Sequence, residues 1–213
     1  MSVNDERIDI QHAIEIEKEK IRNKYLDSAE EIVGGYYIER ELSTDYEGRQ
    51  IFELLQNADD EANGSSGKVH ITFDGKTLIV SNTGNPFTLS GVKSLLYPSA
   101  SPKKISSDKI GCKGLGFRSI LTWANSVTVA SKGFTIQFSR TNAIEFLKSI
   151  LGENPNLKEE IESKSDDDYP IATLTCPKII TQHVLEESYT TSIIIECREE
   201  LAQTIEEQMS LSI

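Results

Sequence analysis

The segment Ile51-Phe-Glu-Leu-Leu-Gln-Asn-Ala-Asp-Asp60 predicts a helix with two chemically distinct faces. At about 100° per residue, Asn57 lies about 40° and Asp60 about −20° from Glu53, so these side chains share one narrow face. The apolar residues fall on the opposite side and can pack on a sheet. Glu53 can then serve as a general base toward water, and the Asn57 amide oxygen can ligate Mg²⁺. The alternative interpretation is a solvated face of an amphipathic helix.

Immediately after this helix, the spacing of apolar residues changes from helical to alternating. Residues 69–73 alternate, Asp74-Gly75 predicts a tight turn, and residues 77–80 continue the pattern, which is typical of a β-hairpin. A second hairpin is predicted over residues 127–138, with a Ser-Lys-Gly turn. Two further strands are expected at about 171–176 and 190–197.

Helical spacing and capping signals predict the remaining elements. A first helix is expected over about 8–33, ended by Gly34-Gly35, and Thr44 with Glu47 forms a capping box that opens the helix ending near Glu61. Shorter helices are predicted at about 116–124, 142–151 and 198–209, and an acidic loop at 152–170. This mixture of hairpins and helices indicates an α+β protein with a largely antiparallel sheet.

Composition narrows the possible functions. The chain has 213 residues with 22 Lys and Arg against 34 Asp and Glu, a net charge of −12, which argues against wrapping of nucleic acid and against binding to anionic membranes. The three cysteines lack metal or disulfide spacing. Because the N-terminus is polar and no apolar run approaches about 18 residues, we expect a cytoplasmic protein without a membrane span.

Two further segments carry glycines where a backbone can approach an anion. Gly111-Cys-Lys-Gly-Leu-Gly-Phe117 precedes a predicted helix, so its N–H groups can face a phosphate. Asn82-Thr83-Gly84 ends the first hairpin. Each segment alone is compatible with an ordinary flexible loop or turn.

Together, in this order, these segments resemble the GHKL ATPases, a family that includes DNA gyrase B subunits, the ninety-kilodalton heat-shock chaperones, histidine kinases and MutL. The segment at 53–60 resembles the family's N-box, 82–84 its DxGxG box, and 111–117 its second glycine box. The residue pattern is most similar to the sacsin-like and No Vein-like branch near the heat-shock chaperones. The resemblance covers about 40–197 and implies one Bergerat-type domain over 1–213: a two-layer sandwich with helices on one face of a mixed, mostly antiparallel sheet.

The resemblance implies a role for each matching residue. Glu53 would be the catalytic base, Asn57 would bind Mg²⁺, and Asp60 would support the nucleotide pocket. Thr191 would reach the adenine. The remaining nucleotide-binding positions would be Asn82, Gly84, Phe87, Gly111, Lys113, Gly114, Leu115, Gly116 and Phe117. Residues 88–117 would form the ATP lid, 1–35 an N-terminal helical extension, and 198–213 a helix leading to a downstream region.

The sequence departs from the family pattern on the adenine side. Asn82 stands where the family has an adenine-reading Asp, although its amide can pair with adenine. Pro86 replaces a glycine, which leaves Phe87 placed to stack on the base, and Thr190 replaces the glycine of the last Gly-Thr pair.

The expected function is binding of Mg–ATP and slow hydrolysis to ADP and phosphate, within a larger chaperone-like or DNA-transaction ATPase that acts on a protein client. The alternative is an ATP-dependent switch that pairs with a second copy through the N-terminal helix and hydrolyses little. A histidine kinase is disfavoured, because His12 lacks a phosphoacceptor context and the chain before the N-box is too short for a dimerisation hairpin.

Overall fold

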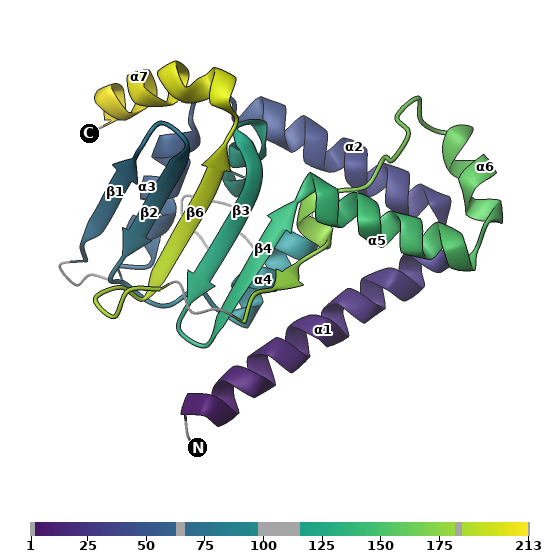
Figure 1. Cartoon of the computed structure of the whole chain (residues 1–213), viewed down its shortest axis with the longest axis horizontal. Coiled ribbons are helices and arrows are strands. Elements are labelled where there is room, and N and C mark those ends of the chain that lie inside the picture. The colour runs from purple at the N-terminus through teal and green to yellow at the C-terminus, as the bar shows by residue number, and fades with distance from the viewer. Residues whose placement is uncertain (1–2, 63–66, 98–115, 182–184, 213) are drawn as a thin grey trace, which may run out of the picture.

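The fold is a six-stranded antiparallel sheet with helices packed around it (Figure 1). The structure, a computed structural model, describes residues 3–62, 67–97, 116–181 and 185–212. The strands are β1 (Val69–Phe73), β2 (Thr77–Asn82), β3 (Ala124–Ser131), β4 (Phe134–Ser139), β5 (Lys178–Ile179) and β6 (Thr191–Cys197), in the order β1-β2-β6-β3-β4-β5. The expected α+β class is confirmed.

The helices come from both halves of the chain. The α-helices are α1 (Val3–Asp27), α2 (Ala29–Asp45), α3 (Gln50–Asp60), α4 (Leu89–Leu96), α5 (Arg140–Glu153), α6 (Asn156–Glu162) and α7 (Ala202–Ser212). Short 3₁₀ helices are η1 (Gly116–Thr122), η2 (Thr173–Thr175) and η3 (Glu199–Leu201). Figure 1 shows α3 and α4 behind the sheet, α2 running from behind β3 outward past α5, and α1, α5 and α6 beyond the β4–β5 end of the sheet. Among the described helices, none is long and apolar enough to cross a membrane.

Two glycine turns set the hairpins, as the sequence predicts. Gly75 has φ of 88° and Gly133 has φ of 103°, a region that L side chains avoid. Asp74 Oδ1 accepts hydrogen bonds from the backbone N–H groups of Lys76 at 2.9 Å and Thr77 at 2.7 Å, which closes the first turn. The registers of β1–β2 and β3–β4 follow from these turns.

The buried face of the sheet is built from apolar rows that cross four strands. The first row is Leu78, Ile195, Val127 and Phe138, and the second is Val80, Ile193, Val129 and Ile136. All eight are less than a tenth exposed. A third row, at the strand ends, is polar where the first two are apolar: Asn82, Thr191 and Ser131, followed by Phe134. This polar row lies at the same end of the sheet as the loop after β2.

The predicted end of the first helix at Gly34-Gly35 is wrong. The helix is interrupted at Ser28, whose hydroxyl caps α2 by accepting from the Glu31 N–H at 3.3 Å. Helix α2 then continues through both glycines. A Cβ on Gly35 would lie 3.5 Å from the Tyr25 hydroxyl, so the glycine permits α2 to pass close to α1. Tertiary contact outweighs the low helix propensity of glycine here.

The predicted capping box at Thr44 is also wrong. Thr44 lies in the last turn of α2 and its hydroxyl donates to the Arg40 carbonyl at 3.0 Å. The chain turns at Gly48, where φ is 83°, and α3 begins at Gln50 without a side-chain cap.

Three predictions in the second half of the chain need correction. The acidic stretch 152–170 contains α6, because Leu157 and Ile161 stand one helical turn apart and are both buried. The strand expected at 171–176 is the 3₁₀ helix η2 instead, because the Glu39 carboxylate accepts its N–H groups in place of a neighbouring strand. The element at 116–124 is likewise a 3₁₀ helix, η1. Strand 190–197 and the helix after it are confirmed.

Candidate functional site

Helix α3 presents the predicted polar face. Ile51, Leu54 and Ala58 are buried, whereas Asn57 and Asp60 are partly exposed on the other side. The Glu53 side chain is 12% exposed, so its carboxylate is held against protein rather than standing free in water.

The Glu53 carboxylate lies against the backbone of Gly116. A Cβ built on Gly116 would fall 1.9 Å from Glu53 Oε2 and 2.5 Å from its Cδ, so any larger residue at this position would have to displace the Glu53 carboxylate. Two segments 63 residues apart in the sequence, the predicted N-box and the end of the predicted second glycine box, therefore meet. The contact places a potential acid or base group against the backbone at the start of η1.

Glu53 also has a partner that the sequence analysis missed. Arg49, one turn earlier on the chain, places Nη2 3.3 Å from Glu53 Oε1. The Arg49 guanidinium lies 5.6 Å from the Phe52 ring centre and 5.8 Å from that of Tyr46. The i, i+4 spacing of Arg49 and Glu53 in the sequence could have indicated this ion pair.

The loop after β2 is tied to the C-terminal end of α3. A Cβ on Gly84 would fall 2.5 Å from the Glu61 carbonyl oxygen, and the Asn85 N–H donates to that oxygen at 2.8 Å. Gly84 is thus required for a close approach of two backbones. The contact brings the predicted DxGxG box to the helix that carries the N-box.

Thr190, which stands where the GHKL pattern that the sequence resembles has glycine, holds the same loop. Its N–H donates to the Asn82 carbonyl oxygen at 2.9 Å, and its hydroxyl lies 3.0 Å from that oxygen and 2.7 Å from the Gly84 carbonyl oxygen. The threonine therefore supplies contacts that a glycine could not. Apart from the substitution itself, no signal in the sequence indicates this role.

Thr191 and Asn82 are neighbours on β6 and β2, and both are buried. The Thr191 hydroxyl accepts from the Phe87 N–H at 2.9 Å, so its own hydrogen remains to be donated. Ser131, a residue that sequence reasoning missed, places its hydroxyl 3.1 Å from the Phe87 carbonyl oxygen. The Phe87 ring packs on Gly91 of α4, where an added Cβ would be 3.0 Å from the ring.

The structure therefore gathers several of the predicted residues into two groups. Glu53 meets Gly116, and Asn82 and Gly84 meet the start of β6, where the Thr191 hydroxyl accepts from the Phe87 N–H. The Phe117 side chain belongs to the hydrophobic core, so only its backbone is available to a ligand. Gly111, Lys113, Gly114 and Leu115 lie outside the described residues, as does the predicted lid from 98 to 115.

The two ends of that lid segment are joined by Arg118, another residue that sequence reasoning missed. Its fully buried guanidinium donates from Nη2 to the Leu95 carbonyl oxygen at 2.7 Å, which links η1 to α4. Burial lowers the pKa of Arg118, and the nearby carboxylate of Glu39 opposes that shift. Burial raises the pKa of Glu39, although the Leu174 N–H donates to it at 2.9 Å.

The N-terminal helix is fastened to the same region by Glu17. Its buried carboxylate accepts from Lys20 Nζ at 2.9 Å and from the Tyr97 hydroxyl at 3.0 Å, and it lies 3.0 Å from Lys93 Nζ. These contacts, led by the Lys20 hydrogen bond, lower the pKa of Glu17 to about 2. Because Lys93 and Tyr97 flank the end of α4, α1 is coupled to the start of the predicted lid.

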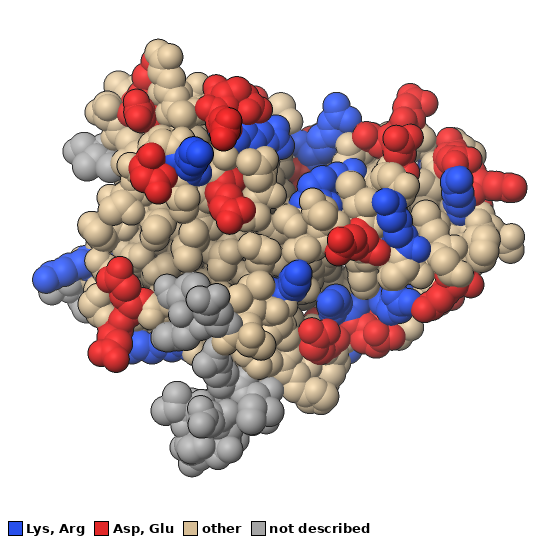
Figure 2. All heavy atoms as spheres, viewed as in Figure 1, with Lys and Arg blue, Asp and Glu red and all other residues tan. Residues whose placement is uncertain are grey.

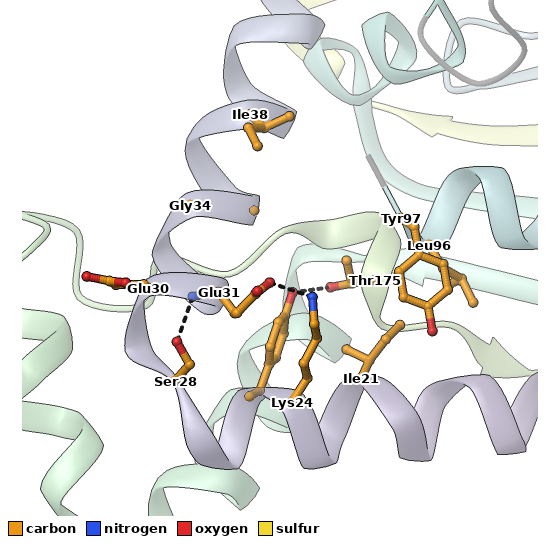
Figure 3. A pocket seen from close by; sticks show the side chains of 12 residues that line it. Ile21, Lys24, Ser28, Glu30, Glu31, Gly34, Ile38, Leu96, Tyr97 and Thr175 are labelled. Carbon is orange, nitrogen blue, oxygen red and sulfur yellow. Dashed lines mark hydrogen bonds and ion pairs between the residues drawn. The ribbon is translucent and has the colours of Figure 1, made fainter. Parts of the chain in front are cut away.

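A separate hollow of about 280 Å³ lies between α1 and α2 (Figure 3). Lys24 and Glu31 form an ion pair of 2.8 Å in it, and the Tyr25 hydroxyl lies 3.4 Å from that of Thr175. Of the predicted site residues that the structure describes, none lines this hollow.

Acidic and basic side chains are intermixed on the face that Figure 2 shows, which is the face of the sheet turned away from α3. Within the part of the chain that the structure describes, no group of three or more His, Cys, Asp or Glu side chains could hold a metal ion.

No family model matches the chain, and no curated protein sequence matches it.

Proposed function

We propose that this protein binds Mg–ATP and hydrolyses it slowly to ADP and phosphate, as the nucleotide-binding module of a larger chaperone-like or DNA-transaction ATPase. The observation that carries the proposal is the contact between the Glu53 carboxylate and the Gly116 backbone. It joins a candidate base to the end of a glycine-rich segment whose sequence resembles a phosphate-binding loop. The net charge of −12 does not oppose ATP, because backbone N–H groups and a metal ion can hold its phosphates without a basic surface.

On the phosphate side, Glu53 would accept a hydrogen bond from the attacking water and orient it toward the γ-phosphate. The backbone from Gly111 to Phe117 would donate to the phosphate oxygens. Mg²⁺ takes one or two protein oxygens and completes its shell with phosphates and water, so the Asn57 amide on the same helix face fits as its ligand. When bound, the ion would stabilise negative charge on the phosphates.

On the adenine side of the site, the buried polar row at the ends of β2, β6 and β3 would recognise the adenine ring. The Asn82 amide can accept from the exocyclic amine and donate to a ring nitrogen. The Thr191 hydroxyl keeps a hydrogen to donate, and Gly84 lets the loop approach closely. Because the Phe87 ring packs on Gly91, its stacking on the base would require the start of α4 to move.

The second candidate is a nucleotide-dependent switch with negligible hydrolysis, and one observation favours it. Arg49 Nη2 forms an ion pair of 3.3 Å with Glu53 Oε1, and this ion pair competes with a water molecule for the carboxylate. In this case ATP would change the contact of α1 with α4, and thereby pairing through the N-terminal helix, without turnover.

Variants of Glu53 separate the two candidates. Glu53→Ala should retain ATP affinity by calorimetry but abolish phosphate release. Glu41→Ala, an exposed glutamate on α2, is the matched control and should change neither quantity. Undiminished phosphate release in Glu53→Ala would exclude Glu53 as the catalytic base. Binding of ATP by the wild type without phosphate release would support the nucleotide-dependent switch instead.

A further inference from the structure

The two edges of the sheet differ in how they are protected. Strand β5 is only two residues long, begins with Lys178 and follows Pro177, features that discourage pairing with another chain. Strand β1, at the other edge, is five residues long with the sequence Val-His-Ile-Thr-Phe and contains neither a Lys, an acidic residue nor a proline (Figure 1). Such an edge is a template for a further strand.

The backbone groups of β1 that point outward can be assigned from its bonds to β2. The Thr83 N–H donates to the Lys68 carbonyl oxygen at 3.0 Å, and the Asp74 N–H donates to the Thr77 carbonyl oxygen at 3.3 Å. Even-numbered residues therefore face β2. Because the direction alternates along an antiparallel strand, the odd-numbered residues 69, 71 and 73 direct their N–H and C=O groups to the outer edge.

The residues that flank the strand make its edge complementary to itself. In an antiparallel pair centred on Ile71, Val69 lies opposite Phe73, and Lys68 lies opposite Asp74 of the other copy. In this register each odd-numbered residue lies opposite an odd-numbered residue of the other copy. Because the odd-numbered residues carry the outward N–H and C=O groups, the two copies can exchange hydrogen bonds. The charges at both ends of the pair are then opposite in sign.

We propose that β1 is a homodimer interface, in which two copies of the six-stranded sheet pair antiparallel about Ile71 to form one continuous sheet. Three opposed residue pairs would exchange about six backbone hydrogen bonds. The arrangement is isologous and closes on itself, so it ends at two copies.

Side chains on both faces agree with this pairing. Ile71 pairs with the buried Val80 in β2, so 69, 71 and 73 lie on the helix-covered face, where they are exposed or half-buried. Pairing would extend the apolar rows of that face with a second copy of the same residues. Lys68, His70, Thr72 and Asp74 lie on the open face, where the Lys68–Asp74 pairs would form at both ends.

Sedimentation equilibrium of the full chain, from about 1 µM to about 1 mM, measures the association, which should be the same with and without Mg–ATP. Amide hydrogen exchange then identifies the surface. The amides of 69, 71 and 73 should become protected as the dimer forms, whereas those of His70 and Thr72, bonded to β2, should be protected at every concentration.

Ile71→Pro removes an outward N–H without removing a bond to β2, and should abolish association while the chain stays folded by circular dichroism. Lys68→Glu places two acidic side chains, the introduced glutamate and Asp74, opposite each other at both ends of the strand pair. Because the repulsion occurs twice in the dimer, the variant should weaken association about tenfold. Lys132→Glu, with the same charge change in the β3–β4 turn, is the control and should leave association unchanged.

The proposal is overturned by a monomer across the whole concentration range, or by a dimer in which amides 69, 71 and 73 exchange as fast as in the monomer. A dimer that requires Mg–ATP and survives Ile71→Pro would also overturn it, and would locate pairing elsewhere. Because no step depends on nucleotide, failure of ATP binding leaves this proposal standing.

Discussion

Replacing Gly116 with alanine tests the contact that carries the functional proposal. The new Cβ would lie 1.9 Å from Glu53 Oε2 and 2.9 Å from its Cγ, whereas ordinary contact begins near 3.4 Å. The carboxylate must therefore move by about 1.5 Å. Because Oε2 is the end of a flexible side chain, this movement should cost only about 1 kcal/mol of stability, the low end for overpacking.

The catalytic cost should be much larger than the structural one. A displacement of about 1 Å in a reacting group can reduce turnover about 100-fold, so Gly116→Ala should lower kcat by about that factor. The backbone N–H at this position is retained in the variant, and ATP affinity should change little. Phosphate release under saturating Mg–ATP gives kcat, and calorimetry gives the dissociation constant.

Gly152→Ala is the matched control. Gly152 lies in α5, and apart from α5 itself no described residue comes within 4 Å of an added Cβ, so the substitution should raise stability by up to about 1 kcal/mol without changing turnover. Turnover in Gly116→Ala equal to wild type, in a protein that remains folded, would refute the assignment of Glu53 as the base beside Gly116.

Three further predictions concern charged side chains. Arg49→Ala should raise kcat severalfold if the ion pair of 3.3 Å restrains Glu53, and a lower phosphate-release rate would contradict that restraint. Glu17→Gln should cost about 1 kcal/mol near neutral pH by urea unfolding, because the lysine partners of the buried Glu17 carboxylate are themselves exposed to solvent. Folding lowers the Glu17 pKa from 4.5 to about 2, so this cost should vanish as pH falls through that window, and a cost that persists below pH 2 would contradict the prediction. Glu39→Ala should lower the free energy of unfolding by about 3 kcal/mol, since a buried acceptor of the Leu174 N–H is lost, and an unchanged unfolding midpoint would contradict this.

The hairpins could be predicted from sequence because their determinants are local. Alternation over 69–73 and the Asp74-Gly75 turn lie within a few residues, and the turn fixes the register. The end of the first helix could not be predicted, since Gly34 and Gly35 look like a terminus until Tyr25 is seen to pack beside Gly35. The helix boundary depends on a contact between two helices rather than on propensity.

The candidate site divides in the same way. The polar face of α3 follows from helical spacing, and Glu53 could be selected from it. The contact of Glu53 with Gly116 and that of Gly84 with Glu61 are tertiary, so the sequence could indicate glycines there without showing what they approach. Arg118 was not predicted, because nothing in the sequence distinguishes an arginine that is fully buried from one on the surface.

A calorimetric titration of the wild-type chain with ATP in the presence of Mg²⁺ tests nucleotide binding directly. The proposed site predicts saturable binding of one nucleotide per chain, weakened when Mg²⁺ is removed and when Asn57 is replaced by alanine. Absence of binding at millimolar ATP, with the protein folded and Mg²⁺ present, would contradict the proposed nucleotide site.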